Sequence, residues 1–435
     1  MRLRWWLTAI PMLAAVAWPG AGAHAQGLSP SEILQQFNAV VFDNFSSTAD
    51  VEGRTVIGGN LTGGATFALN ATAEAASAFA ALNVYGSVTS RGNFNLDSAA
   101  GAAIAGGNAG SFTLNHGGSV FVGGKNTGNL SVTNGGGNIA VLGSNRGTLS
   151  LSNGGSVFVG AANTAGITIN NGSSASNSVV INGNNSGYLT LNSGGTVKVN
   201  GNAGSGTLNG GSLTYTGRTG SWNLNDGAKA SKVASVSLTA PGNPLPAFAS
   251  TFEQPLVALS NQLSVLTPTS TVLVNGDNLT LEAKPSANGI AVLDLSTSQF
   301  QPNDSVSVAL NGAKSLIVNL SVAGCSKNCS YTFPSSVNFQ NTTSYADSVL
   351  WNLTDVSSLS FTNAFGGSVL APIASVTNTG PINGDLIALK FSGGGELHDY
   401  PFTGPLPTPE PSGLAVLAVG LIGADVVRRR RRRSL

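Results

Sequence analysis

The residues best suited to chemistry stand late in the chain, where Glu396 and His398 flank a leucine and Asp399 follows. Alternate residues of a strand point to the same face, so Glu396 and His398 would lie side by side. A carboxylate and an imidazole so placed could bind a metal ion if a third ligand came from elsewhere. The simpler interpretation is that they hydrogen-bond to each other and to their neighbours, and we predict no metal site.

Other polar groups are too scattered to predict an enzyme. Polysaccharide lyases and hydrolases need clustered carboxylates or a basic residue acting as a base. Asp50, Glu52 and Arg54 alternate on one face, and an ion pair explains them. The long stretch from Ser111 to Ala228 contains few charges, namely Lys125, Arg146, Lys198, Arg218 and Asp226. We therefore predict a protein that is not an enzyme and has no cofactor; the alternative is a carbohydrate-active enzyme that uses Glu396 or a site spread over several loops.

The two cysteines, Cys325 and Cys329, are separated by three residues. In an exported protein, a disulfide across this tight turn is the expected state. A metal site built on two thiols is less favoured, because only His116 and His398 remain once a signal peptide is removed.

The N-terminus predicts export. Arg2 and Arg4 precede an apolar run from Trp5 to Trp18, and Ala23 and Ala25 flank His24 in a small-residue cleavage site. This pattern is typical of a secretory signal peptide over residues 1–25, removed by signal peptidase.

The C-terminal tail has three parts: Pro409, Glu410 and Pro411, then an apolar run over residues 413–427, then arginines from Arg428 onward. A helix of that length spans about 22 Å, which is short for a hydrocarbon core of about 30 Å. Arginines fix the cytoplasmic side of such a segment. The tail resembles the PEP-CTERM sorting signal of Gram-negative bacteria. The resemblance implies a transient inner-membrane anchor, a transmembrane helix over 413–427 and cleavage by an exosortase near Pro409–Pro411. The residues that carry this expectation are Pro409, Glu410, Pro411, Arg428, Arg429 and Arg430.

The body between these ends is acidic, although the whole chain carries +1. Of the 20 basic residues, 12 remain when Arg2, Arg4 and the six tail arginines are left out. Of the 19 acidic residues, 17 remain when Glu410 and Asp425 are left out. The net charge of the body is therefore −5. This balance argues against nucleic acid as a partner.

The middle of the chain repeats itself with a period of about 18–19 residues, which marks a solenoid. Each repeat has a short strand, a glycine-rich turn, a second short strand and a Gly/Asn corner. Alternation predicts that the first strands point these pairs inward: Phe112/Leu114, Leu130/Val132, Leu149/Leu151, Ile167/Ile169 and Leu189/Leu191. The fold class is therefore all-β, a β-helix whose coils stack to bury a shared core.

Two outward stripes follow from the same alternation. One is polar and consists of Thr113, Ser131, Ser150, Thr168 and Thr190. The other is mostly apolar and consists of Phe121, Ala140, Phe158, Val180 and Lys198. We expect another part of the chain to cover the apolar stripe, and the alternative is an adhesive patch. The amphipathic spacing of Phe252, Leu256, Leu259, Leu263 and Leu266 predicts a helix over 251–266 that packs along the solenoid as this cover. A capping box at Ser29–Glu32 predicts a second, short helix.

Several motifs lie on either side of the repeats: Phe37–Phe45, Asp50–Asn60, Val349–Leu353, Gly367–Pro372, Ile382–Ala388 and Gly394–Phe402. Together they resemble the choice-of-anchor A domain of bacterial surface proteins. The resemblance covers about residues 37–404 and implies a surface protein that carries one of several sorting signals. The family has no catalytic residues that could be assigned to positions of this chain. The plan is also similar to ice-binding β-helices, in which a helix lies along a split solenoid.

These observations predict an exported structural or adhesive protein of the cell surface or extracellular matrix. The alternatives are a secreted carbohydrate-active enzyme on a β-helix and an ice-binding protein. Expected partners are signal peptidase, exosortase, the inner membrane transiently, and exopolysaccharide or other matrix proteins. The expected domains are a signal peptide (1–25), a β-helical domain (26–404), a Pro-rich linker (405–412), a transmembrane segment (413–427) and an arginine-rich cytoplasmic tail (428–435). Within the β-helical domain we expect the repeat solenoid at 94–228, the helix at 251–266 and C-terminal strands at 271–402.

Overall fold

The computed structural model describes residues 27–407. The predicted signal peptide with Ala23 and Ala25, and the predicted sorting residues from Pro409 to Arg430, lie outside this range. The described chain forms two compact units. Unit 1 contains residues 77–83 and 98–246, and unit 2 contains residues 27–76, 84–97 and 247–407.

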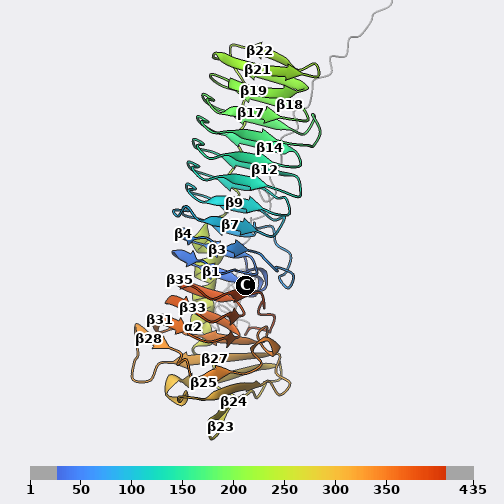
Figure 1. The fold of residues 1–435 in the computed structure, drawn as a ribbon. Coiled ribbons are helices and arrows are strands. Elements are labelled where there is room, and N and C mark those ends of the chain that lie inside the picture. Colours follow the sequence, from blue (N-terminus) through green and yellow to red (C-terminus); the bar gives the residue numbers. More distant parts are fainter. Residues whose placement is uncertain (1–26, 408–435) are drawn as a thin grey trace, which may run out of the picture. The chain divides into compact units, whose positions relative to one another are not determined.

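Unit 1 is a parallel β-solenoid whose rungs contribute one strand to each of two sheets (Figure 1). The first sheet contains β8 (Ala102–Ile104), β10 (Val120–Val122), β12 (Gly137–Val141), β14 (Gly155–Val159), β16 (Ser178–Ile181), β18 (Gly195–Val199), β20 (Gly211–Tyr215) and β22 (Lys229–Lys232). The second contains β9 (Ser111–Leu114), β11 (Leu130–Val132), β13 (Leu149–Leu151), β15 (Ile167–Ile169), β17 (Tyr188–Leu191), β19 (Gly204–Asn209) and β21 (Thr219–Asn225).

The predicted alternation of the repeats is confirmed. Equivalent residues pair from coil to coil, as Leu130 does with Leu149 and Leu149 with Ile167. All of the predicted inward pairs of the second sheet are buried, whereas the residue between each pair is half-exposed. The coils therefore share one continuous apolar core, as a solenoid requires.

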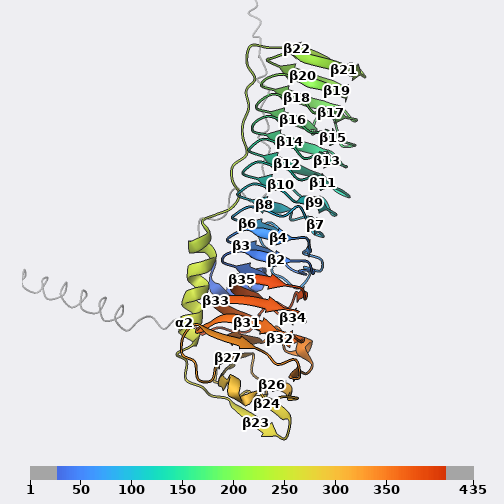
Figure 2. The ribbon, with the colours of Figure 1, turned by 60° about the vertical axis from the view of Figure 1, so that its left-hand side comes forward.

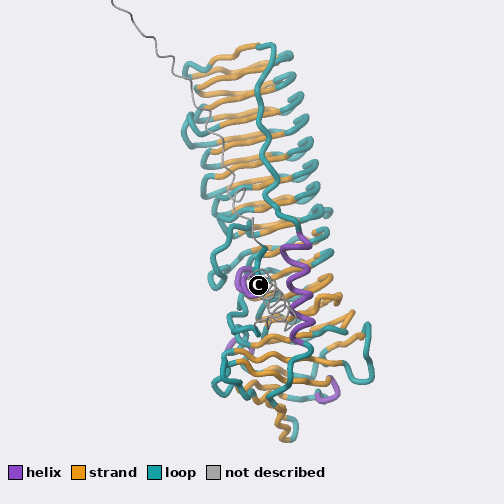
Figure 3. The backbone as a smooth tube through the Cα atoms, turned by 180° about the vertical axis from the view of Figure 1, so that it is seen from behind, coloured by secondary structure: helices purple, strands orange, loops and turns teal. Residues whose placement is uncertain are grey.

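In the apolar stripe on the outer face of the first sheet, Phe121, Ala140 and Phe158 are buried, while Val180 and Lys198 are half-exposed. The stripe is covered, as expected, but not by the predicted helix. Phe121, Ala140 and Phe158 pack into one cluster with Leu142 and Val180 at its margin. An extended segment, residues 233–246, runs back along unit 1 from β22 (Figures 2 and 3). Its apolar residues are half-buried: Val233, Val236, Leu238, Pro241, Pro244 and Leu245.

Contacts at one end of this segment place that end next to the apolar stripe. Pro244 and Leu245 line the same cavity, of about 230 Å³, as Phe121 of β10. An extended chain advances about 3.3 Å per residue, so fourteen residues reach past several coils spaced about 4.8 Å apart. Phe121, Ala140 and Phe158 are consequently part of the interior of unit 1 and do not form an adhesive patch.

Unit 2 contains a second parallel stack. Its rungs follow the order β25 (Ile290–Ser296), β27 (Ser315–Ser321), β30 (Val349–Asn352), β33 (Ser368–Asn378), β35 (Leu386–Gly393), β1 (Ala39–Val41) and β3 (Thr55–Ile57). The first strand of the chain thus pairs with the last long one, Val40 opposite Ile387. The stack is split in sequence but continuous in space.

Shorter strands complete unit 2. They are β2 (Phe45–Ser47), β4 (Leu61–Gly63), β5 (Thr66–Phe67), β7 (Asn93–Leu96), β23 (Thr271–Asn275), β24 (Asn278–Glu282), β26 (Ser305–Ala309), β28 (Cys329–Thr332), β29 (Asn338–Phe339), β31 (Val356–Phe361), β32 (Phe365–Gly366), β34 (Ile382–Asn383) and β36 (Leu397–His398), while β6 (Leu82–Val84) begins in unit 1 and ends in unit 2. Two 3₁₀ turns, η2 (Thr297–Gln299) and η3 (Thr342–Ser344), connect some of them. β23 and β24 form the antiparallel hairpin that ends the four-stranded sheet β23–β24–β26–β29. Cys325 and Cys329 form a disulfide beside β28.

The short N-terminal helix, α1 (Pro30–Gln36), has the predicted capping box. The Ser29 hydroxyl accepts from the Glu32 backbone N–H at 3.3 Å, and the Glu32 carboxylate accepts from the Ser29 N–H at 2.8 Å. The Ser29 hydroxyl also donates to the Glu32 carboxylate at 2.7 Å, and this bond, together with the one from the Ser29 N–H, holds the pKa of Glu32 below its usual value. The helix buries Ile33 and Leu34 in the core of unit 2.

The amphipathic helix exists, but it covers unit 2 rather than the stripe of unit 1. A π-helical turn, η1 (Ala249–Glu253), leads into α2 (Gln254–Leu263). Pro255, in the first turn of α2, has no backbone N–H, so it cannot donate the hydrogen bond that would extend a regular α-helix towards the N-terminus. Phe252, Leu256, Leu259 and Leu263 are buried, and the side chain of Ser260 hydrogen-bonds Asn352 of β30 at 2.6 Å. The predicted helix end at Leu266 was three residues too late.

The expected transmembrane helix is not found among the described residues. Within residues 27–407, no helix is long and apolar enough to cross a membrane. The longest described helix, α2, has ten residues, whereas a span needs about 20. The segment 413–427, for which the helix was predicted, lies outside the described range.

Candidate functional site

The broadest candidate surface in unit 1 is the outer face of β9, β11, β13, β15, β17 and β19, here called the hydroxyl wall. Its central column contains only hydroxyl side chains, all half-exposed: Thr113, Ser131, Ser150, Thr168, Thr190 and Thr207. The two flanking columns lie two residues away along each strand. One contains Thr133, Ser152, Asn170 and Asn192, and the other contains Ser111, Asn129, Thr148 and Tyr188.

The wall is a regular lattice of neutral hydrogen-bonding groups. Its rows are about 4.8 Å apart and its columns about 6.7 Å apart, as the geometry of a parallel sheet dictates. Hydrogen bonds link neighbouring coils on this face, from Asn192 to Asn170 at 2.6 Å and between Tyr188 and Thr207 at 2.8 Å. None of the wall residues named here is charged. Such a surface suits an uncharged ligand rich in hydroxyl groups or ordered water.

A buried asparagine ladder at the adjacent corner holds the coils in register. Asn108, Asn126, Asn145, Asn163 and Asn185 stack directly above one another and are at most 2% exposed. In the last of them, Asn185, the amide nitrogen donates to the Ala203 carbonyl at 2.9 Å; in the other four, each amide nitrogen donates to the amide oxygen of the next asparagine at 2.7–2.8 Å. It also donates to the backbone carbonyl two residues along its own chain at 2.7–2.8 Å. Sequence reasoning identified these asparagines only as corner residues; the signal that it missed was their recurrence at the repeat period.

In unit 2 the predicted polar pair Glu396 and His398 lies at β36. His398 Nε2 is 2.9 Å from Glu396 Oε2, and its Nδ1 is 2.6 Å from the amide oxygen of Asn383. Both ring nitrogens thus have hydrogen-bonding partners. Across residues 27–407 there is no group of three or more His, Cys, Asp or Glu side chains that could hold a metal ion.

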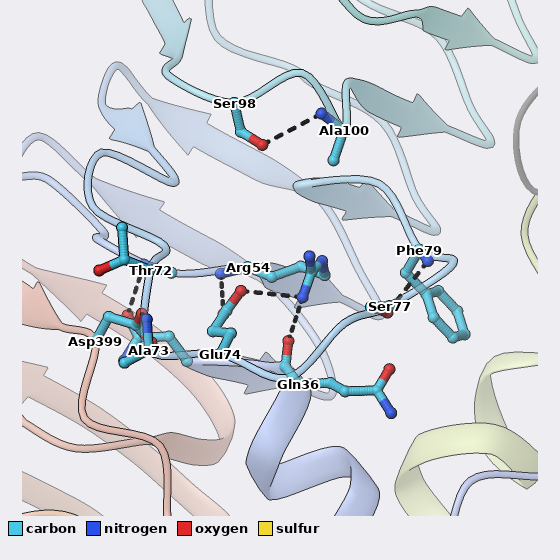
Figure 4. Close-up of polar contacts among 12 residues, drawn as sticks. Gln36, Arg54, Thr72, Ala73, Glu74, Ser77, Phe79, Ser98, Ala100 and Asp399 are labelled. Atoms are coloured by element: carbon cyan, nitrogen blue, oxygen red, sulfur yellow. Dashed lines mark hydrogen bonds and ion pairs between the residues drawn. The ribbon is translucent and has the colours of Figure 1, made fainter.

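A second polar group in unit 2 is deeply buried and centres on Arg54 and Glu74 (Figure 4). Arg54 Nη1 donates to Glu74 Oε2 at 3.0 Å and to the backbone carbonyl of Gln36 at 2.7 Å. The Glu74 side chain is only 1% exposed, and its other oxygen accepts from the Arg54 backbone N–H. Asp399 adjoins this group and accepts from the Ala73 N–H at 3.2 Å.

Burial has a clear electrostatic consequence for these carboxyl groups. It raises the pKa of Glu74 to about 7, although the Arg54 charge opposes the change. It likewise raises the pKa of Asp399 to about 6. Burial also raises the pKa of Asp385 well above its usual value; that side chain accepts from Ser368 and from the Phe402 N–H at 2.9 Å each. Because Glu74 is sealed from solvent, we assign this network a structural role rather than a catalytic one.

The network explains why several of the sequence motifs stand where they do. The predicted ion pair among Asp50, Glu52 and Arg54 is not formed in that way. Arg54 instead pairs with Glu74, and Glu52 accepts from the Asp399 N–H at 2.9 Å. The motifs around residues 50–54, 382–388 and 394–402 therefore meet where the beginning and the end of unit 2 join.

Comparisons with known proteins gave matches to family models and to a solved structure. The family described as "Putative Ice-binding-like adhesive domain" matches residues 30–151 and 118–399. The PEP-CTERM protein-sorting motif matches residues 407–432. An ice binding protein from an Antarctic bacterium, Flavobacteriaceae, has a solved structure with 15% sequence identity and a TM-score of 0.22, and the comparison covers 86% of this chain and 98% of that one. The search of curated proteins gave no match.

The two matches establish an adhesive domain joined to a sorting signal, which implies export to the cell surface and processing by an exosortase. The adhesive domain model covers most of the body and includes both units. The chain therefore belongs to the family of ice-binding-like adhesive domains.

Proposed function

We propose that this exported surface protein adheres through the hydroxyl wall of unit 1, and that its ligand is a neutral polysaccharide of the matrix or of another surface. The observation that supports this proposal is the in-register lattice of uncharged hydroxyl and amide groups over β9–β19. Sugar hydroxyl groups both donate and accept hydrogen bonds, as serine, threonine and asparagine side chains do.

The fold favours a rigid adhesive surface. The asparagine ladder and the shared core fix the wall before a ligand binds, so little conformational entropy is lost on binding. A repeated surface also lets several weak contacts act together along one polymer. Binding rather than catalysis is the role that this arrangement supports.

The wall can be tested with the double variant Ser150→Lys and Thr168→Lys. Both residues lie in the central column and point outward, so the fold should tolerate lysine while the lattice gains two bulky charges. We expect retention of the exported protein on an insoluble neutral glucan to weaken by about tenfold or more. The matched control is Thr127→Lys with Thr164→Lys. Both threonines are exposed and each follows an asparagine of the buried ladder, so the control adds the same charge outside the wall.

The outcomes separate the candidate functions. Equal retention of both variants on the glucan would overturn the proposal. Ice binding is the second candidate, because the central column repeats hydroxyl groups at every coil; thermal hysteresis that only the wall variant loses would assign the wall to ice. Turnover of a glycan that Glu396→Ala abolishes would instead indicate the carbohydrate-active enzyme.

The finer assignments are also proposals. We infer that the family motifs place the chain among choice-of-anchor A proteins, that signal peptidase cleaves after Ala25, and that exosortase cleaves near Pro409–Pro411. Mass spectrometry of both termini in the culture medium and in the envelope tests the two cleavages. Exported protein that retains Arg428–Arg433 would contradict the second.

A further inference from the structure

The two units differ sharply in charge, although the sequence alone shows only a mildly acidic body. Unit 1 has a single described acidic residue, Asp226, and six basic residues, so its net charge is +5. The basic residues are Lys125, Arg146, Lys198, Arg218, Lys229 and Lys232. The described part of unit 2 has 16 acidic and 6 basic residues and carries −10. Opposite charges on two parts of one chain favour contact between different copies.

The last rung of unit 1 is an open end. Within residues 27–407, β21 pairs only with β19, and β22 pairs only with β20 (Figure 1). Leu224 of β21 is 37% exposed, whereas the equivalent core residues Leu208 and Leu191 are fully buried. The indole of Trp222 covers part of the opening and donates to the Gly204 carbonyl at 3.0 Å. Backbone groups and apolar side chains therefore remain available for another strand.

The charges on this open end are mainly basic. Lys229 and Lys232 lie on β22 itself and are exposed. Arg218, in the turn before β21, is exposed as well, and Asp226 is the acidic residue of the same rung. Two copies meeting edge to edge in antiparallel fashion would place lysine opposite lysine, which is unfavourable. The end of unit 1 thus discourages pairing with itself and suits an acidic strand.

Unit 2 offers an exposed edge strand with acidic neighbours at β23 (Thr271–Asn275), which itself carries no charge. Among the described residues, β23 pairs only with β24, so one of its edges is free. Leu273 and Val274 are 57% and 60% exposed, an unusual state for large apolar residues on an edge strand. Asp277 lies in the adjoining hairpin turn and Glu282 lies opposite Thr271 on β24, while Lys284 follows that strand.

We propose that copies of this chain associate head to tail, with β23 of one copy adding to the free edge of β22 in the next. The main-chain hydrogen bonds continue the sheet. Leu273 and Val274 point to opposite faces of β23, so one of them covers the apolar residues exposed at the open rung and the other packs on the outer face of the sheet. Asp277 and Glu282 meet Lys229 and Lys232. The contact joins two different surfaces and is therefore heterologous, the type of contact from which extended assemblies are built.

Sedimentation of the protein in its exported form tests this proposal. We expect reversible, concentration-dependent association at about 0.02 M salt that weakens at about 0.5 M, where screening is strong. The charge reversal Lys229→Glu with Lys232→Glu should weaken self-association by about tenfold or more, and so should Asp277→Lys with Glu282→Lys. Mixing these two variants should restore association, because their altered ends are again complementary.

A matched control reverses the same amount of charge elsewhere in unit 1. Lys125→Glu with Arg146→Glu alters two exposed residues at the asparagine corner, and self-association should not change. Thermal unfolding of each variant checks that it is folded. Protein that sediments as a monomer at every salt concentration, or a control that weakens association equally, would overturn the proposal. A further outcome would also overturn it: the protein stays monomeric but binds soluble polyuronate, and the Lys229 and Lys232 changes abolish that binding. This result would identify an anionic polymer as the partner of this end.

Discussion

Replacing Arg54 by alanine is expected to lower the free energy of unfolding of unit 2 by about 3–5 kcal/mol at neutral pH, which is typical for a broken buried ion pair. The change leaves Glu74, whose side chain is 1% exposed, without its cation. It also removes the hydrogen bond to the Gln36 carbonyl. Glu74 would then take up a proton to avoid a buried charge, so the loss should be smaller in acid.

The measurement can be made specific to unit 2. Trp222 and Trp351 are the tryptophans between the two terminal segments. In a Trp222→Phe background, the fluorescence of the fully buried Trp351 therefore reports on unit 2. Lys390→Ala is the matched control, because Lys390 pairs with Asp43 at 3.4 Å on the exposed surface of the same unit. That change should cost about 0–1 kcal/mol. Equal losses for the two variants would contradict the structural role assigned to the Arg54 network.

The same network predicts how the stability of unit 2 depends on pH. Burial raises the pKa of Glu74 from 4.5 to about 7 and that of Asp399 from 3.8 to about 6. The folded state therefore holds protons that the unfolded state releases between these values. Their contribution is fully present below about pH 4 and is lost as pH rises through about 7. Urea unfolding should show this decline, and Glu74→Gln should flatten it. Stability that rises from pH 5 to pH 7.5 would be incompatible with the predicted direction.

The sequence predicts the coils of unit 1 well because their signal is local. Alternation within a three-residue strand, such as Leu149 to Leu151, is enough to identify the inward side chains. The capping box at Ser29 and the spacing of Leu256, Leu259 and Leu263 are local signals of the same kind. Each was confirmed in the structure, with small errors at the helix ends.

Features that depend on distant parts of the chain escaped prediction. The pairing of Val40 with Ile387 joins strands that are separated by most of the sequence. Glu74 lies in an alanine-rich stretch that gives no sign of a buried ion pair with Arg54. The cover of the apolar stripe was assigned to the amphipathic helix, because its periodicity is visible, whereas the extended segment around Leu238 has none. Charge segregation likewise became visible only when the fold showed which residues belong to which unit.

Replacing Asn145 by alanine is expected to destabilise unit 1 by about 3–5 kcal/mol, because several buried polar groups lose their partners at once. Asn145 is fully buried and donates to the Gly147 carbonyl and to Asn163, each at 2.7 Å. It also accepts from Asn126 at 2.7 Å. Water cannot replace these bonds without entering the corner of the coil.

The effect should be local, because each coil of a solenoid contacts chiefly its neighbours. Amide hydrogen exchange should therefore quicken most in β12 and β13 and in the coils on either side, β10–β11 and β14–β15, and less in coils further away. Asn192→Ala is the matched control: Asn192 also makes an amide–amide bond between coils, at 2.6 Å to Asn170, but it is exposed. Solvent can satisfy the groups that this change frees, so we expect a loss of about 0.5 kcal/mol or less. Similar losses for the two variants would mean that burial of the ladder does not strengthen it, and that the shared apolar core alone holds the coils in register.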